Sequence, residues 1–438
     1  MNYRLIPDTN DGVLQMVLQN VVIAGASVAG VTAARELRAQ GYTGHLTIID
    51  RDPHSPYRRP EVSKGLVSGV LGLDKVSMPW PDDLDAERLV GVELTGLNLA
   101  ERSVSISTAA GTRDIGFDGL IIATGTVSRP SPFGEGIPGV HSLRNYTDSI
   151  KMRDELVDAR SLVVVGGGFI GLEVAAVARS LGKSVTVVEA AALPLERVFG
   201  EEFSLQLLKN HQLQGVDVRL GASVSSLERG ESGAVSEVVL GDGSRIPADV
   251  VLVAIGSVPA TTWLAGSGVD ISQGVICDAT CAVLDEKGAV IDGVVAAGDA
   301  VTWYNSLYQR QMRVEHWTNA IEQGAYAAKR LLGTHDPDGF VSAPYFWSDQ
   351  YGSRIQSIGS TFGHDEAVVL DDDPDLLLVA YLHEGRLVAV AGMKAGASIF
   401  RYRALVNSGG SLDEVRAHAQ ALREAAEAKR QQVLERTA

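Results

Sequence analysis

The chain has very little cysteine: Cys277 and Cys281 are the only two among its 438 residues. Two cysteines cannot form the disulfide framework of a small secreted protein, and so low a number fits a reducing compartment. Long apolar runs are also lacking, since no segment reaches the roughly 18 consecutive apolar residues that a spanning helix needs. The first 34 residues carry Arg4 as their one basic side chain and show no signal or transit peptide. We therefore expect a cytoplasmic protein that does not insert into a membrane.

Positive charge is scarce as well. The 38 Lys and Arg residues face 54 Asp and Glu residues, which gives a net charge of −16. The field of such a molecule repels nucleic acid and anionic membrane surfaces, so we expect neither as a partner. The nine histidines are scattered without ligand spacing, and no metal or iron–sulfur site is expected.

What the chain does contain is typical of an ordered globular enzyme, with 45% hydrophobic residues, 21% charged residues and 47 glycines. At about 150 residues per domain, the length predicts roughly three domains. Residues 21–24 and 46–49 are apolar strand patterns on either side of a helical pattern at 31–40. The same order returns with strands at 162–165 and 185–188 around a helix at 172–180. Both units predict parallel strands joined by a right-handed crossover.

The turn of the first unit reads Gly25-Ala26-Ser27-Val28-Ala29-Gly30. A glycine-rich turn between a strand and a helix allows a pyrophosphate to approach the backbone and the helix N-terminus. Ser27 stands where the motif has its middle glycine, and the alternative is a purely structural turn. Asp50 and Asp52 stand at the distance expected of an acid that binds ribose hydroxyls.

The turn of the second unit, Gly166-Gly167-Gly168-Phe169-Ile170-Gly171, has every glycine of the motif. Glu189 ends the next strand and can bind the adenosine ribose. Residues 190–192 are all alanine, where a 2′-phosphate would need Arg or Lys. This site is expected to prefer NADH over NADPH.

Two such motifs, together with the turn Gly298-Asp299 after a further strand, indicate a flavin and a nicotinamide in one enzyme. From about residue 21 to 408 the sequence resembles the FAD-dependent, NADH-using reductases of ferredoxin, putidaredoxin and rubredoxin that supply oxygenases. The resemblance is carried by PYRRPEVSK at 56–64, EHWTNA at 315–320 and YFWSDQY at 345–351. The chain departs from the family pattern at Ser27, Glu61, Ala260 and Gly352.

The resemblance implies three catalytic residues. Lys64 would lie near the reactive edge of the flavin, and Glu173 where the nicotinamide enters. A lysine there stabilises negative charge gained on reduction, and an acid can hold that lysine. Trp347 would be an aromatic step between flavin and partner. The alternatives are a surface charge for Lys64 and a core aromatic for Trp347.

The resemblance also implies the cofactor contacts. Asp299 would bind the ribityl chain, Arg129 the phosphates or ring, and Trp317 the flavin pyrimidine, unless Trp317 is a plain core aromatic. The residues expected to bind FAD are Gly25, Ser27, Ala29, Gly30, Asp50, Arg51, Asp52, Arg59, Lys64, Leu94, Thr124, Gly125, Arg129, Asp299, Glu315, His316 and Trp317. Those expected to bind NADH are Gly166, Gly168, Phe169, Ile170, Gly171, Glu189 and Gly256.

The predicted fold is α/β, with two Rossmann-like dinucleotide-binding domains of the glutathione-reductase-like type, for FAD and NADH, and a C-terminal α+β interface domain. We expect an N-terminal extension at 1–18, an FAD-binding domain at 19–125 and 257–333, an NADH-binding domain at 126–256, and the interface domain at 334–438. Hinges are expected near residues 124–125 and 256–257, where each strand runs into a glycine.

The expected activity is hydride transfer from NADH to FAD, followed by transfer of single electrons to a small acidic iron–sulfur protein of the ferredoxin type that supplies an oxygenase. Because no cysteine precedes Cys277, a disulfide reductase of this architecture is excluded. One alternative is an NADH oxidase or apoptosis-inducing-factor-like flavoprotein that uses oxygen or a quinone. Another is a flavoprotein whose cofactors act as a switch or scaffold. We expect a monomer or a homodimer.

An acidic ferredoxin and a reductase of charge −16 repel each other unless the charge is reversed locally. A basic docking patch is therefore predicted, and the alternative is that the arginines concerned are scattered surface charges. The candidates are Arg58, Arg59, Arg310, Arg313, Arg354, Arg401 and Arg403.

Overall fold

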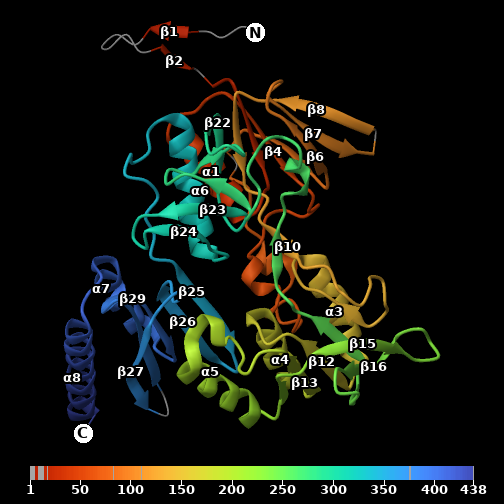
Figure 1. Ribbon diagram of the computed structural model, residues 1–438, viewed down its shortest axis with the longest axis vertical. Helices are drawn as coiled ribbons and strands as arrows, with labels where there is room; N and C mark the ends of the chain where they lie inside the picture. Colours follow the sequence, from red (N-terminus) through yellow and green to blue (C-terminus); the bar gives the residue numbers. More distant parts are fainter. Residues whose placement is uncertain are drawn as a thin grey trace. The chain divides into compact units, whose positions relative to one another are not determined.

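The computed structural model describes the backbone of residues 5–7, 14–16, 18–81, 83–109, 111–373 and 376–437. The chain forms two compact units (Figure 1). Unit 1 takes in the described residues of Met1–Arg58, Val76–Val127 and Val258–Val341, and unit 2 those of Arg59–Lys75, Ser128–Ser257 and Ser342–Ala438. The extension expected at 1–18 lies largely outside the described residues. Within it, β1 (Leu5–Pro7) pairs antiparallel with β2 (Leu14–Met16).

Unit 1 is built on a nine-stranded sheet of order β24-β23-β20-β21-β22-β9-β3-β4-β5. Its strands are β3 (Asn20–Ala24), β4 (His45–Asp50), β5 (Glu87–Val90), β9 (Gly119–Ile122), β20 (Val275–Cys277), β21 (Ala282–Leu284), β22 (Val290–Ala296), β23 (Val301–Asn305) and β24 (Arg310–Arg313). Strand β3 pairs in parallel with β4 and β9, and β9 with β22. The unit also contains α1 (Val28–Ala39), η2 (Thr262–Leu264), α6 (Trp317–Leu332) and an antiparallel sheet of β6 (Glu93–Asn98), β7 (Ser103–Thr108) and β8 (Gly111–Gly116).

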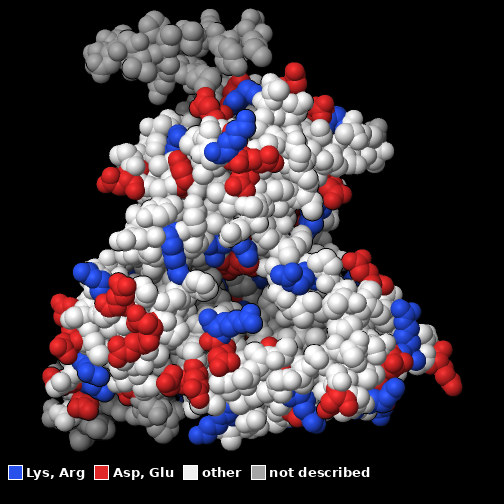
Figure 2. Space-filling view, viewed as in Figure 1, with Lys and Arg blue, Asp and Glu red and all other residues white. Residues whose placement is uncertain are grey.

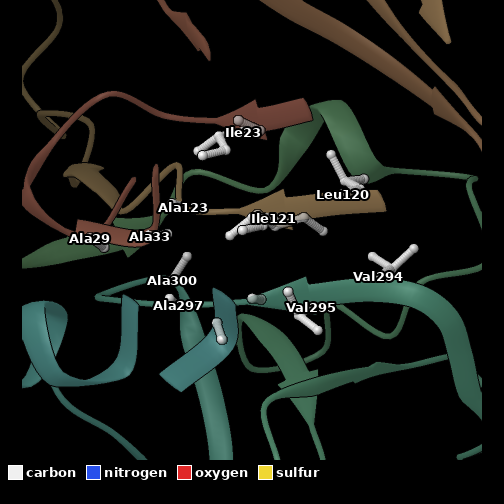
Figure 3. Close-up of a cluster of buried hydrophobic side chains, with 14 of the residues drawn as sticks. Ile23, Ala29, Ala33, Leu120, Ile121, Ala123, Val294, Val295, Ala297 and Ala300 are labelled. Atoms are coloured by element: carbon white, nitrogen blue, oxygen red, sulfur yellow. The ribbon is translucent and has the colours of Figure 1, made fainter. Parts of the chain in front are cut away.

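The core of unit 1 lies between the nine-stranded sheet and helices α1 and α6. Ile23, Ile121 and Val295 stand in register on three neighbouring strands (Figure 3). Burial of each such aliphatic side chain contributes about 1.5–3 kcal/mol. The two helices meet closely, because a Cβ at Gly324 of α6 would lie 2.4 Å from the carbonyl oxygen of Ala29 in α1. This packing holds the first residues of α1 against α6.

Unit 2 contains a five-stranded parallel sheet of order β11-β18-β12-β13-β14. The strands are β11 (Val140–His141), β12 (Ser161–Val165), β13 (Ser184–Glu189), β14 (Asp217–Leu220) and β18 (Val250–Val253). The helices of this part are α3 (Tyr146–Asp158), α4 (Phe169–Ser180) and α5 (Glu196–Leu213). Strands β15 (Val224–Arg229), β16 (Val235–Leu240) and β17 (Arg245–Pro247) form an antiparallel sheet of their own.

The C-terminal part of unit 2 is an antiparallel sheet of order β25-β26-β29-β28-β27 with helices after it. Its elements are β25 (Tyr345–Gln350), β26 (Ser353–Gly359), β27 (Glu366–Asp373), β28 (Leu376–His383), β29 (Arg386–Met393), η3 (Gly396–Tyr402), α7 (Arg403–Ser408) and α8 (Leu412–Thr437). Alternate side chains of a strand point to opposite faces. Phe346, Ser348 and Gln350 therefore share one face of β25, and all three contact helix α4 or α5.

The predicted fold class is confirmed: two parallel strand–helix–strand units are followed by a separate α+β part. Helices α1 and α4, which follow the two glycine-rich turns, begin three residues earlier than predicted, at Val28 and Phe169. The reason is that Gly30 and Gly171 lie in the first helical turn rather than in the loop. A Cβ at Gly30 would stand 1.9 Å from the oxygen of Gly25, and a Cβ at Gly171 2.2 Å from the oxygen of Gly166. Only glycine allows the helix to begin so close to the turn.

The chain passes between the units at 58–59, 75–76, 127–128, 257–258 and 341–342. Two of the linking segments, β10 (Thr126–Ser128) and β19 (Ser257–Pro259), form a two-stranded sheet. A third segment, Arg59–Lys75, also belongs to unit 2, although the sequence groups it with the first FAD-binding part. It contains η1 (Arg59–Glu61) and leads into α2 (Leu73–Val76). In the part of the chain that the structure describes, no helix combines the length and apolar character that crossing a membrane requires.

Candidate cofactor and electron-transfer site

The first glycine-rich turn is shaped by backbone contacts. Gly25 has φ of +113°, and a Cβ on it would lie 2.2 Å from the oxygen of Ala123. Its N–H donates to the oxygen of Ile49 (2.7 Å). Ser27 is the N-cap of α1 with φ −80° and ψ −170°. Because any L-residue adopts that conformation, the backbone does not require glycine at this position.

Of the two acids after this turn, Asp50 serves the turn itself. Its carboxylate accepts from the N–H of Ala26 (2.5 Å) and from that of Asp52 (2.8 Å). The Asp52 side chain contacts two nearby side chains: one oxygen lies 2.8 Å from His54 Nδ1, and the other accepts from the Tyr57 hydroxyl at 2.8 Å. Asp50 therefore makes the same two contacts in the first strand–helix–strand motif that Glu189 makes in the second, to the second residue of the turn and to the residue two positions after the acid.

The second turn repeats this geometry. Gly166 has φ of +108°, and a Cβ on it would lie 2.4 Å from the oxygen of Ala254. Glu189 accepts from the N–H of Gly167 (2.6 Å) and from that of Ala191 (2.7 Å). Gly168 is the N-cap of α4 with φ −78°, and no described atom lies within 4 Å of the place its Cβ would take. The open space at this helix N-terminus suits a pyrophosphate.

Buried amides at the start of α6 provide the test of whether unit 1 fits FAD. Asn319 is 1% exposed, and neither polar atom of its side chain is hydrogen-bonded among the described residues. Gln323 accepts from the N–H of Gly298 (2.8 Å) through Oε1, while its Nε2 is buried without a bond in the described part. Buried amides normally have partners, so these atoms are available to a polar ligand. FAD fits a cradle made of the first turn, Gly298-Asp299 and these amides. The sequence predictions did not include Asn319 or Gln323.

Three other predicted FAD residues lie around the start of α6. Arg313 Nη1 donates to Glu315 Oε1 (2.6 Å) and to the backbone oxygen of Asp299 (3.1 Å). His316 is the N-cap of α6, and burial lowers its pKa to about 4, so the imidazole is neutral at pH 7. Trp317 is the first helical residue and packs against the core of unit 1.

The remaining predicted FAD residues are divided between the units. In unit 1, the Thr124 hydroxyl donates to the oxygen of Ala260 (2.9 Å), and Gly125 accepts from the N–H of Ala260 (2.9 Å). Ala29, Leu94 and the exposed Arg51 also belong to unit 1. The members in unit 2 are Arg59, Lys64 and Arg129. There Arg59 donates to the oxygen of Arg144 (3.1 Å), and the N–H of Arg129 to the oxygen of Gly256 (2.9 Å).

Lys64 and Glu173, 109 positions apart in the sequence, form an ion pair in unit 2. Their Nζ and Oε2 atoms are 2.8 Å apart, and the side chains are 15% and 5% exposed. Lys64 also donates to the oxygen of Pro60 (3.0 Å). Glu173 accepts from the hydroxyl of Ser63 and, through Oε1, from that of Ser348 (2.6 Å). The carboxylate thus has three donors, and neither serine was predicted from the sequence.

Phe169 and Ile170, predicted to bind NADH, and Trp347 differ in their surroundings: Phe169 and Trp347 have aromatic neighbours, and Ile170 is exposed. Phe169 packs against Phe346 (ring centroids 4.2 Å apart) and meets Phe199 edge-on at 5.8 Å. Ile170 is 38% exposed. Trp347 stacks on Tyr345 at 5.9 Å, on the face of β25 opposite to Phe346. Phe346 was not predicted as a site residue.

The cysteines do not form a redox centre. Both Cys277 and Cys281 are free and fully buried, and burial raises the pKa of both thiols. The interpretation of these residues as small buried side chains is confirmed. Among the described residues, no group of His, Cys, Asp and Glu side chains has the arrangement of a metal site.

Two of the arginines offered as docking candidates have acidic partners. Besides Arg313, whose partner is Glu315, Arg354 forms a two-pronged pair with Asp349 at 2.6 and 3.0 Å, which raises the pKa of the arginine. On the face shown in Figure 2, basic and acidic side chains are interspersed. Arg313 and Arg354 are therefore poor candidates for a docking patch.

Two dinucleotide cradles in one chain, with an antiparallel C-terminal sheet, define an FAD- and NAD(P)H-using oxidoreductase. The chain belongs to the pyridine nucleotide-disulphide oxidoreductase family, whose model matches residues 19–324, and a reductase C-terminal domain matches residues 345–426. Relatives include a ferredoxin–NAD(P)⁺ reductase of Sphingomonas sp. (34% identical, covering 89% of this chain and 93% of the relative) and putidaredoxin reductase of Pseudomonas putida (33%, 85% and 87%). The chain is also similar to the reductase solved in a covalent putidaredoxin reductase–putidaredoxin complex, with a TM-score of 0.83 and 30% identity over 89% of this chain and 93% of that one.

Proposed function

We propose that this chain oxidises NADH and delivers single electrons to a small acidic iron–sulfur protein of the ferredoxin type, which supplies an oxygenase. The observation that carries the proposal is the presence of both dinucleotide cradles in a chain whose only cysteines are buried as thiols. Electrons that reach the flavin therefore need an acceptor other than a protein disulfide. Relatives named for ferredoxin, putidaredoxin and benzene dioxygenase systems support an iron–sulfur acceptor. A cytoplasmic location fits free thiols and the use of NADH.

The proposed domains are those expected from the sequence, with FAD bound by 19–125 and 257–333 and NADH by 126–256. The first turn, Asp50 and the start of α6 would hold FAD, and the second turn with Glu189 would hold NADH. FAD, when bound, accepts a hydride from the nicotinamide and releases electrons singly. The chain's own contribution is to bind and orient the two cofactors and to hold the Lys64 ammonium in place through Glu173.

The proposal is tested by reconstituting the protein with FAD and adding NADH without oxygen. We expect the flavin absorbance to bleach, and cytochrome c reduction to become fast only when a [2Fe–2S] ferredoxin is added. A flavin that stays oxidised with excess NADH would show that the cofactors serve as a switch or scaffold. Bleaching without any gain on addition of ferredoxin would contradict the proposed acceptor.

Cofactor choice gives a separate prediction. Glu189→Arg removes the carboxylate that repels a 2′-phosphate and adds a cation that binds one. We expect the ratio of kcat/KM for NADH over NADPH to fall by about tenfold or more, the effect of one charge-assisted hydrogen bond. Glu201→Arg makes the same charge change at an exposed position of α5 and should leave the ratio unchanged. A wild-type ratio at or below one would contradict the role of Glu189.

A further inference from the structure

The Lys64–Glu173 pair is one end of a longer hydrogen-bond chain within unit 2. From Glu173 Oε1 the chain continues to the hydroxyl of Ser348 (2.6 Å), which accepts from Gln350 Nε2 at 3.1 Å. Ser348 is 0% and Gln350 2% exposed. The chain thus runs along one face of β25, away from the ion pair and into the protein.

Two more residues complete the chain. Gln350 Oε1 lies 2.8 Å from Nε2 of His211, near the end of α5, and His211 Nδ1 lies 2.9 Å from the hydroxyl of Tyr351. His211 is 1% exposed, and burial lowers its pKa to about 4. The imidazole is therefore neutral at pH 7, with one donor nitrogen and one acceptor nitrogen.

The ion pair fixes the direction of every bond in this chain. Glu173, paired with Lys64, only accepts, so the single proton of the Ser348 hydroxyl points to it. Ser348 then accepts from the Gln350 amide, whose oxygen in turn accepts from His211 Nε2–H. The remaining nitrogen of the neutral ring, Nδ1, accepts from the Tyr351 hydroxyl. If every hydrogen bond pointed the other way, a lone pair of the Ser348 hydroxyl would face the Glu173 carboxylate, and the two would repel each other.

Tyr351 is held in an unfavourable backbone conformation at the end of this chain. It and Gly352 form the two-residue turn between β25 and β26, with φ of +51° and +72°. Such turns favour asparagine, aspartate or glycine, and a positive φ is costly for a tyrosine. The turn chemistry does not explain a tyrosine here, whereas its hydrogen bond to His211 does.

We propose that His211 is a positioning residue for the reaction of NADH with the flavin. Together with Tyr351 it fixes the Gln350 amide and the Ser348 hydroxyl, which hold the Glu173 carboxylate, and through it the Lys64 ammonium, in one orientation. The inference rests on the proposed role of Lys64 and Glu173 in that reaction. It also ties the C-terminal strand β25 to the electron-transfer site.

The first test uses two variants that keep the size of the side chain. Tyr351→Phe removes the hydrogen bond to His211 Nδ1, so the imidazole ring is no longer held in place against Gln350. The carboxylate introduced by Gln350→Glu still accepts from His211 but offers Ser348 an acceptor in place of a donor, so the single Ser348 proton is divided between two carboxylates and is no longer held on Glu173. In anaerobic stopped-flow experiments, each should slow flavin reduction by NADH about fivefold, the effect of one ordinary hydrogen bond, with the Kd for NADH unchanged.

Tyr381→Phe is the matched control. The buried Tyr381 hydroxyl donates to the backbone oxygen of Phe199 (2.7 Å), so it too joins the C-terminal sheet to α5, but it does not reach Glu173. We expect the wild-type rate. Wild-type rates in both Tyr351→Phe and Gln350→Glu, or an equal loss in Tyr381→Phe, would overturn the proposal.

A second readout does not depend on activity. With ¹⁵N-labelled histidine, the His211 ring should show the Nε2–H tautomer in the wild type. Glu173→Gln removes the charge that sets the direction, so His211 should then populate both tautomers. If His211 kept the Nε2–H tautomer alone in Glu173→Gln, the proposal would be overturned. If NADH fails to reduce the wild-type flavin, the proposed function fails. The tautomer result still decides whether Glu173 sets the direction of the hydrogen bonds that lead to His211.

Discussion

Gly30→Ala is expected to yield a protein that retains less FAD on purification than the wild type. The added Cβ would stand 1.9 Å from the oxygen of Gly25 and 3.2 Å from a methyl group of Ile23, and both of these residues are buried. The clash with a backbone atom can be relieved only by moving α1 away from its turn, which is the proposed cradle of the pyrophosphate. Overpacking of this kind costs about 1–3 kcal/mol, so FAD affinity should fall by about tenfold or more.

The matched control is Gly116→Ala, also in unit 1. No described atom lies within 4 Å of a Cβ at Gly116, and its φ is not positive. This variant should keep the yellow colour and the flavin content of the wild type, measured as the ratio of visible flavin absorbance to ultraviolet protein absorbance. A Gly30→Ala protein with full flavin content would show that FAD does not depend on this turn.

Glu173→Leu is expected to damage both stability and catalysis. It leaves Lys64, only 15% exposed, without its ion-pair partner, and it removes the acceptor of the Ser63 and Ser348 hydroxyls. Removing one member of a buried pair costs about 3–5 kcal/mol, so the free energy of unfolding in urea should fall by about 3 kcal/mol. Flavin reduction by NADH should slow markedly, because only the oxygen of Pro60 then holds the lysine.

The double variant Lys64→Met with Glu173→Leu separates the two effects. Without an unpaired cation, its free energy of unfolding should exceed that of Glu173→Leu, because an apolar pair replaces a broken ionic one. Its rate of flavin reduction should remain low. A single variant as stable as the wild type would show that the pair is not buried as the structure has it.

The two glycine-rich turns could be predicted from the sequence because their determinants are local. Gly25, Gly30, Gly166 and Gly171 each stand where a Cβ would collide with a backbone carbonyl of the turn or an adjacent strand, and that requirement leaves a fixed spacing in the chain. The hydrophobic pattern predicts the helix starts three residues late because Gly30 and Gly171 interrupt it, whereas in the structure each of these glycines lies in the first turn of its helix.

The surroundings of Glu173 could not be predicted in this way. Its partners Ser63 and Ser348 are 110 and 175 positions away, and His211 reaches Gln350 across 139 positions. Serine, glutamine and histidine at such separations leave no periodic pattern, because their pairing depends on how strands and helices pack. The membership of Arg59–Lys75 in unit 2 has the same origin, since contacts such as Ser149 with the oxygen of Val62 (2.8 Å) define it.

The most direct test of the account measures how the NADH-reduced protein loses its electrons. The protein is reduced anaerobically with one equivalent of NADH and mixed in a stopped-flow instrument either with an oxidised [2Fe–2S] ferredoxin or with air-saturated buffer. We expect flavin absorbance to return much faster with ferredoxin, with parallel bleaching of the iron–sulfur band. Reoxidation that is faster with oxygen than with ferredoxin would contradict the account and identify the chain as an NADH oxidase.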